Sequence, residues 1–193
     1  MRNPIYFPKV VNEMPKITDP DVVLLATIAA SLKGDYLSQR AHWTDSPFEW
    51  ILSCPSRQRG KIGEQLVAGW CAAKNLNVNR SPDSEADKII EGRRVEVKFS
   101  TLWQSGGYTF QQIRDQNYDF ALFLGVSPFD AHAWVISKAL LYKHVIGHTP
   151  QHRGAKGTDT FWLSFGVTEP PDWLKPCGGK LGQAWEILKK WKR

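Results

Sequence analysis

The chain has few cysteines and no long apolar run. Only Cys54, Cys71 and Cys177 occur among 193 residues, and no two of them form a Cys-x-x-Cys pair. An odd number of widely spaced cysteines argues against a disulfide scaffold or a zinc knuckle and predicts reduced thiols in a cytoplasmic protein. The longest apolar run, 22–30, is too short to cross a bilayer, and the N-terminus lacks the apolar stretch of a signal peptide.

Positive charge exceeds negative charge. Lys and Arg number 25 against 19 Asp and Glu, which gives a net charge of +6 and a pI near 9.3. This balance favours a polyanionic partner. A length of 193 residues predicts one domain, 1–193, with a helical N-terminal extension over 1–56, a core over 57–140, and a basic loop, strand and C-terminal helix over 141–193.

The most informative stretch reads Asp-Lys-Ile-Ile-Glu-Gly-Arg-Arg-Val-Glu-Val-Lys-Phe-Ser, from Asp87 to Ser100. Apolar and polar residues alternate on both sides of Glu-Gly, which predicts a β-hairpin with strands at 88–90 and 94–99. Gly92 supplies the positive φ that a two-residue turn needs. A loop of this length fixes the register of the two strands.

That register separates an apolar face from a charged face. The apolar face carries Ile90, Val95, Val97 and Phe99. The charged face carries Asp87 opposite Glu96, with Lys98 one pleat further along and opposite Glu85. Carboxylates about 5 Å apart repel, unless a cation lies between them. Oxygen ligands at this spacing suit Mg²⁺, so the face indicates a phosphodiester-cleaving site, although ordinary ion pairs on an exposed hairpin could give the same pattern.

This pattern resembles the PD-(D/E)xK nuclease superfamily, and type II restriction endonucleases most of all. The resemblance implies a restriction-endonuclease-like α/β fold, with a central mixed β-sheet flanked by helices. It further implies that Asp87, Glu96 and the Val97 carbonyl hold Mg²⁺, or Mn²⁺ in its place. Lys98 would position the attacking water, and Glu64, on the preceding helix, would lie beside the metal.

The sequence departs from the family motif in one place. Ala86, rather than proline, precedes Asp87, whereas a literal Pro82-Asp83 lies four residues upstream. Asp83 therefore stays open as the metal ligand, but it would lie near the mouth of the strand, so we prefer Asp87. A three-residue hairpin loop would turn Asp87 to the opposite face and remove the site.

Basic residues outside the hairpin are candidates for DNA contact. The segment 56–61 leads into a helix expected over 62–76 and brings Arg57, Arg59 and Lys61 to its start. It lacks the spacing of a nucleotide P-loop, so we interpret these three residues as phosphate contacts and expect no nucleotide cofactor. A solvated charged turn explains them nearly as well.

Two later segments add further candidates. The glycine-rich loop 148–157 is basic, and its Arg153 and Lys156 could contact phosphate or base edges. A polar helix is expected over 108–115, after a flexible loop over 100–107. The resemblance implies that Gln111 or Gln112 of this helix lies beside the scissile phosphate; we choose Gln112.

Other elements are expected from residues that typically begin or end helices and from the pattern of apolar residues. Residues 1–18 are expected to be extended, and Asp19-Pro20 opens an apolar helix that Gly34 ends. Strands are expected at 118–126, 131–136 and 160–165. His144, His148 and His152 recur every four residues, but Gly147 and Pro150 interrupt the helix, so a zinc site is disfavoured.

Together these patterns predict a Mg²⁺-dependent endonuclease of double-stranded DNA, specifically a site-specific type II restriction enzyme. We expect a homodimer in the cytoplasm, encoded by a prokaryote or by a phage. The alternatives are a Holliday-junction, repair or phage-borne nuclease of the same fold, and a basic DNA-binding module without catalysis.

Overall fold

The computed structural model describes residues 18–151 and 159–192. The chain divides into two compact units between Ala41 and His42. The described part of the first unit consists of α1 (Pro20–Leu37) and the start of the 3-10 helix η1 (Ser38–Trp43). Residues 42–56, predicted as part of the N-terminal extension, belong to the second unit.

Helix α1 begins where the sequence predicts. The backbone N–H groups of Asp21 and Val22 donate to Asp19 Oδ1 over 2.9 and 3.2 Å, which confirms the aspartate cap. The helix continues through Gly34 and ends at Leu37, three residues later than predicted. Within the described residues, every helix is too short or too polar to span a bilayer.

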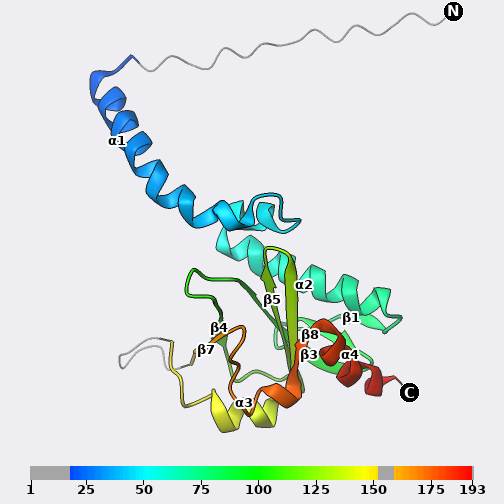
Figure 1. Ribbon diagram of the computed structural model, residues 1–193. Coiled ribbons are helices and arrows are strands. Elements are labelled where there is room, and N and C mark those ends of the chain that lie inside the picture. The colour runs from blue at the N-terminus through cyan, green and yellow to red at the C-terminus, as the bar shows by residue number, and fades with distance from the viewer. Residues whose placement is uncertain (1–17, 152–158, 193) are drawn as a thin grey trace, which may run out of the picture. The chain divides into compact units, whose positions relative to one another are not determined.

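The second unit contains a six-stranded mixed β-sheet, and this confirms the predicted α/β class (Figure 1). Strands β3 and β5 are parallel, and the other neighbouring pairs are antiparallel. In spatial order the strands are β1 (Val78–Arg80), β2 (Lys88–Ile90), β3 (Arg93–Thr101), β5 (Phe120–Ser127), β6 (Asp130–Ser137) and β8 (Gly178–Lys180).

Each face of this sheet packs on a separate hydrophobic core. One core includes α2 (Ser56–Ala73) and α4 (Leu181–Leu188). The other includes α3 (Lys138–His144) and the antiparallel pair β4 (Gly107–Ile113) and β7 (Phe161–Gly166), which lie side by side in Figure 1. Short 3-10 helices complete the unit: η2 (Glu49–Ser53), η3 (Lys175–Cys177) and η4 (Lys189–Trp191).

The predicted hairpin turn and the register of its two strands are confirmed. Strands β2 and β3 are joined by Glu91 and Gly92, with φ values of 47° and 78°. Two successive residues of positive φ form the turn type that matches the twist of a two-residue hairpin. Lys88 pairs with Val95 and Ile90 with Arg93, which is the register that a two-residue loop requires.

The prediction of a helix at 108–115 is wrong, because residues 107–113 form strand β4. Tyr108 and Phe110 are buried and Thr109 between them is partly exposed, which is the period-two pattern of a half-covered strand. The preceding loop is also shorter than predicted: β3 extends to Thr101, and Gly106 N–H donates to Trp103 O in a tight turn. Similarly, the basic segment 56–61 forms the first turns of α2 rather than leading into it.

Candidate functional site

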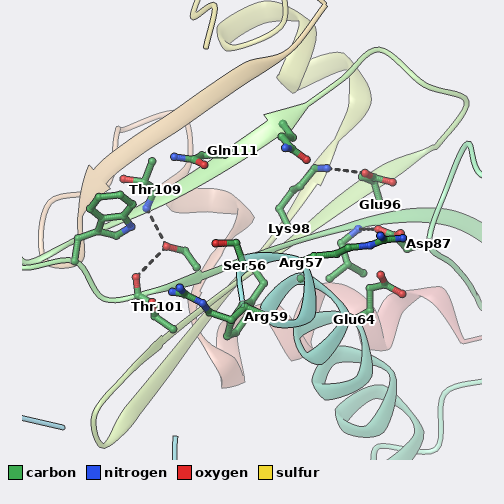
Figure 2. Close-up of a pocket in the computed structure, with 16 residues that line it drawn as sticks. Ser56, Arg57, Arg59, Glu64, Asp87, Glu96, Lys98, Thr101, Thr109 and Gln111 are labelled. Carbon is green, nitrogen blue, oxygen red and sulfur yellow. Dashed lines mark hydrogen bonds and ion pairs between the residues drawn. The ribbon is translucent and has the colours of Figure 1, made fainter. Parts of the chain in front are cut away.

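One cavity of about 550 Å³ collects most of the predicted site residues. This volume is within the usual range of ligand-binding pockets. The predicted residues that line it come from α2, the approach to β2, and strands β3 and β4: Arg57, Arg59, Glu64, Asp87, Glu96, Val97, Lys98 and Gln112 (Figure 2). We call it the hairpin cavity.

Asp87 is held against strand β3 by its own backbone and side chain. Its N–H donates to Val95 O over 3.1 Å, and its Oδ2 accepts from the Val97 N–H over 2.7 Å. The N–H and C=O of one strand residue point to the same side of the strand. The Val97 carbonyl therefore faces the same edge of β3 as the Asp87 carboxylate.

Glu96 and Lys98 form a closely packed ion pair on β3. Lys98 Nζ lies 2.7 Å from Glu96 Oε1, and the two side chains are 15% and 9% exposed. Figure 2 shows both residues projecting into the hairpin cavity near Asp87. Asp87, Glu96 and Lys98 thus lie in one cavity, as the charged face of the hairpin predicts.

The two carboxylates influence each other's ionisation. Burial raises the pKa of Asp87; the hydrogen bond from Val97 N–H opposes this shift and the charge of Glu64 adds to it. Burial likewise raises the pKa of Glu96, where Lys98 opposes the shift and Asp87 adds to it. Lys98 and Lys88 also oppose the shift at Asp87, but burial remains the largest cause at both carboxylates, and a further cation would lower both pKa values.

The donor set fits a hard divalent cation. Two carboxylates and one backbone carbonyl are oxygen ligands of the kind that Mg²⁺ takes, with water completing its shell. In residues 18–151 and 159–192, no three His, Cys, Asp or Glu side chains form a group that could hold a metal ion. A metal here would therefore depend on the Val97 carbonyl and on water in addition to Asp87 and Glu96.

Glu64 lines the hairpin cavity together with Asp87, and it already has cationic partners. Its Oε2 accepts from Lys61 Nζ over 2.7 Å and from Lys88 Nζ over 3.1 Å. Helix α2 brings Glu64 here because Gly63 packs directly against Phe99 of β3. Glu64 lines both the hairpin cavity and a neighbouring cavity, so its participation in catalysis stays a prediction.

Two acidic residues considered in the prediction lie elsewhere. Asp83 pairs with Arg94, which lowers the pKa of the Asp83 carboxyl, and it does not line the hairpin cavity. Glu85 was predicted opposite Lys98, and this is wrong: its Oε2 accepts from the Asn117 N–H over 3.1 Å. The reason is that residues 81–87 form turns and bends rather than an extension of β2.

Lys61 and His144, two further residues singled out in the sequence, lie outside the hairpin cavity. Lys61 lines the neighbouring cavity of about 650 Å³, together with Arg80 and Lys88. Arg153 and Lys156 fall outside the described residues. His144 stacks on Trp173 with ring centroids 4.6 Å apart, which is a packing role.

Ser100, Trp103 and Thr109 are among the residues of the hairpin cavity that sequence reasoning missed. Ser100 Oγ accepts from the Thr109 N–H over 3.1 Å and so joins β3 to β4. Trp103, in the tight turn between these strands, is 52% exposed. The alternation of aromatic and polar residues from Tyr108 to Gln111 was the signal that could have identified β4 and its exposed Thr109.

The sequence matches no protein-family model and no curated protein at a significant level. Among solved structures, the chain is similar to a bacterial homing endonuclease, I-Ssp6803I, with a TM-score of 0.46 and 18% sequence identity. The match covers 70% of this chain and 93% of that one. It concerns the arrangement of strands and helices, and we take no residue role from it.

Proposed function

We propose that the protein is a Mg²⁺-dependent endonuclease of double-stranded DNA, of the PD-(D/E)xK type. The observation that carries this proposal is the pair Asp87 and Glu96, held near each other in a cavity with Lys98. Lys98 pairs directly with Glu96, whereas Asp87 accepts from the Val97 N–H, and burial outweighs the charges of Lys98 and Lys88 at the Asp87 carboxyl. The half-buried Asp87 carboxylate raises the energy of the metal-free protein, and a bound cation would stabilise it.

In this proposal, Asp87, Glu96 and the Val97 carbonyl hold the ion. When bound, Mg²⁺ would stabilise negative charge on the phosphoryl oxygens and lower the pKa of an attacking water. The Lys98 ammonium, oriented by Glu96, would donate a hydrogen bond to that water or to a non-bridging phosphate oxygen. Glu64 would keep Lys61 and Lys88 in place and accept a hydrogen bond at the edge of the site.

The walls of the hairpin cavity suit the DNA backbone. Arg57 and Arg59 lie in the first turn of α2, where the free backbone N–H groups of a helix also favour anions. Arg59 is positioned by donating from Nε to Cys54 O over 2.9 Å. We expect both arginines to bind phosphates that flank the cut, and Lys61 to bind one further along. Arg153 and Lys156 keep the same predicted role.

We also propose that the enzyme acts as a site-specific type II restriction endonuclease and as a homodimer in the prokaryotic cytoplasm. One chain contributes one such site, and cutting both strands requires two. Helix α1 exposes six apolar side chains, each 44–64% accessible, and we expect it to pair with α1 of a second copy. Sedimentation of the full chain tests this directly.

Digestion of a plasmid of known sequence tests the activity. The wild-type protein should cut with Mg²⁺ and stop cutting with EDTA. Glu96→Ala and Lys98→Ala should each slow cleavage about 100-fold or more, while DNA binding stays within a few-fold. Glu186→Ala, on the exposed side of α4, is a matched control that should cut at the wild-type rate.

The result separates the alternatives. Discrete fragments support a restriction enzyme, a smear supports a nonspecific nuclease, and cleavage confined to branched substrates supports a junction or repair nuclease. Binding without cleavage under every metal condition supports a DNA-binding module. If both variants cut normally, the site has been assigned wrongly.

A further inference from the structure

Strands β4 and β7 form a two-stranded ribbon with one buried and one exposed face. The buried face packs in the core beside α3 and the main sheet, with side chains of Tyr108, Phe110, Ile113, Phe161, Leu163 and Phe165. The other face carries Thr109, Gln111, Gln112, Trp162 and Ser164. An antiparallel pair commonly leaves one face to solvent in this way.

The exposed face, of which Thr109, Gln111 and Gln112 line the hairpin cavity, has a chemistry unlike that of the part of the cavity formed by α2. Its five side chains are all uncharged and offer hydroxyl, amide and indole groups. The part of the hairpin cavity formed by α2 carries Arg57 and Arg59. Cations bind phosphates without regard to sequence, whereas neutral donors and acceptors are the groups that discriminate base edges.

A β-bulge presents two amides at the same point of the ribbon. Phe110 pairs with Leu163 and Ile113 with Phe161, so Gln111 and Gln112 together oppose the single residue Trp162. Gln112 has a φ of 54°, and its N–H donates to Gln151 Oε1 over 2.9 Å. A non-glycine residue in this conformation costs free energy, and such bulges are typical beside functional sites, where they re-aim side chains.

The ribbon is fixed relative to the carboxylates. Tyr108 lies so close over Gly125 of β5 that a Cβ there would be 2.6 Å from its ring, and its hydroxyl is 3.1 Å from His132 Nδ1. Thr109 is bound through its N–H to Ser100 on β3, the strand that carries Glu96. Figure 2 shows Thr109 and Gln111 in the same cavity as Lys98.

We propose that the exposed face of this ribbon enters the DNA major groove and reads the base pairs beside the scissile phosphate. This inference rests on the proposed function and adds the residues that determine its sequence specificity. A two-stranded ribbon fits the major groove, and a glutamine amide pairs with adenine N6 and N7. Gln111 and Gln112 therefore select adenine, while Trp162, 43% exposed, contacts the methyl group of a thymine.

The two hydroxyl groups on the exposed face of the ribbon have a smaller role in recognising bases. Thr109 Oγ1 and Ser164 Oγ lie 2.9 Å apart across the two strands, so each hydroxyl already has a partner. Each hydroxyl oxygen keeps a lone pair free and accepts from an exocyclic amine.

A randomised pool of DNA duplexes tests the proposal. Wild type, a Gln111→Ala/Gln112→Asn double variant and a Gln65→Ala control are incubated with the pool and Mg²⁺, and the cut ends are sequenced. Asparagine tolerates the positive φ at 112 but has a shorter side chain. Gln65 is an exposed glutamine on α2 that lines neither cavity, and its variant should behave as wild type.

Wild type should cut next to a motif that contains adenine. The double variant should have a preference for adenine over other bases at that position that is about 10- to 100-fold weaker. An unchanged motif in the double variant, or cutting by wild type without any motif, overturns the proposal. If thermal melting shows that the double variant is unfolded, Ser164→Ala replaces it. We expect this second variant to lose less of the base discrimination.

Selection of bound duplexes from the same pool separates this proposal from the proposed function. If wild type binds DNA but never cuts it, the nuclease proposal fails, while base reading by the ribbon can still be tested. Loss of adenine enrichment among duplexes bound by the double variant then supports base reading by the ribbon. Equal enrichment for both proteins, or enrichment by neither, overturns it.

Discussion

Glu96 and Lys98 differ from an ordinary surface ion pair in how little of either side chain reaches solvent. Exposed pairs contribute little to stability, because water screens both charges. Here the Lys98 ammonium also balances a second carboxylate, Asp87, whose charge raises the pKa of Glu96. Removing Lys98 would leave two like charges in a partly desolvated cavity.

We therefore expect Lys98→Met to lower the free energy of unfolding of the metal-free protein by about 1–3 kcal/mol. Chemical denaturation at neutral pH measures this. Lys189→Met removes a lysine that is 58% exposed, 3.5 Å from Glu186, and should change stability by less than about 0.5 kcal/mol. Equal stability of Lys98→Met and wild type would show that Asp87 and Glu96 do not repel in the folded protein.

At this scale, the sequence predicted which hairpin residues would meet. Alternation and a two-residue turn are local properties, and they were sufficient to place Asp87 near Glu96 and Lys98. Lys88 was missed as a partner of Glu64, and Glu85 was misplaced, because their contacts join segments 24 and 32 residues apart. Local patterns carry no information about such contacts.

Helix α2 and strand β3 approach each other closely where the site is formed. A Cβ on Gly63 would lie 2.3 Å from the Phe99 Cβ, so only glycine permits this approach. The next residue along the helix is Glu64, and the next residue before Phe99 on the strand is Lys98. The packing of these two elements thus sets the distance between the acidic helix and the hairpin.

We expect Gly63→Ala to destabilise the protein by about 1–3 kcal/mol, because the added methyl group overpacks this contact. Gly69→Ala is the matched control: it lies in the same helix, with nothing within 4 Å of its Cβ, and should stabilise by about 0.5–1 kcal/mol. Thermal unfolding of both variants gives the comparison. A neutral Gly63→Ala would mean that α2 can move away from β3 without cost.

The elements were predicted unevenly, for a physical reason. Strands β5 and β6 are covered on both faces and read as apolar runs, so their existence was clear from sequence. Strand β4 is short, bulged and half exposed, and its polar residues fall at spacings that also suit a helix. Its strand conformation depends on pairing with β7, about fifty residues later, which no local pattern shows.

The charge of the whole molecule adds a prediction about binding. A net charge of +6 favours DNA at long range, whereas Arg57 is expected to contact a phosphate. Arg57→Ala should therefore reduce the salt dependence of DNA binding by about one unit in the slope of log K against log salt. Binding isotherms at several salt concentrations measure the slope. Lys190→Ala, at the exposed C-terminal end, is the control: it also removes one positive charge but should leave the slope nearly unchanged. Equal slopes for the two variants would contradict a direct contact between Arg57 and a phosphate.

The position of a bound metal ion tests the central claim most directly. Crystals of the protein soaked in Mn²⁺ should give one anomalous peak within about 2.3 Å of oxygens of Asp87 and Glu96 and of the Val97 carbonyl, and Glu96→Ala should remove it. A peak elsewhere, or none at millimolar Mn²⁺ with both carboxylates ordered, would contradict the proposed metal site.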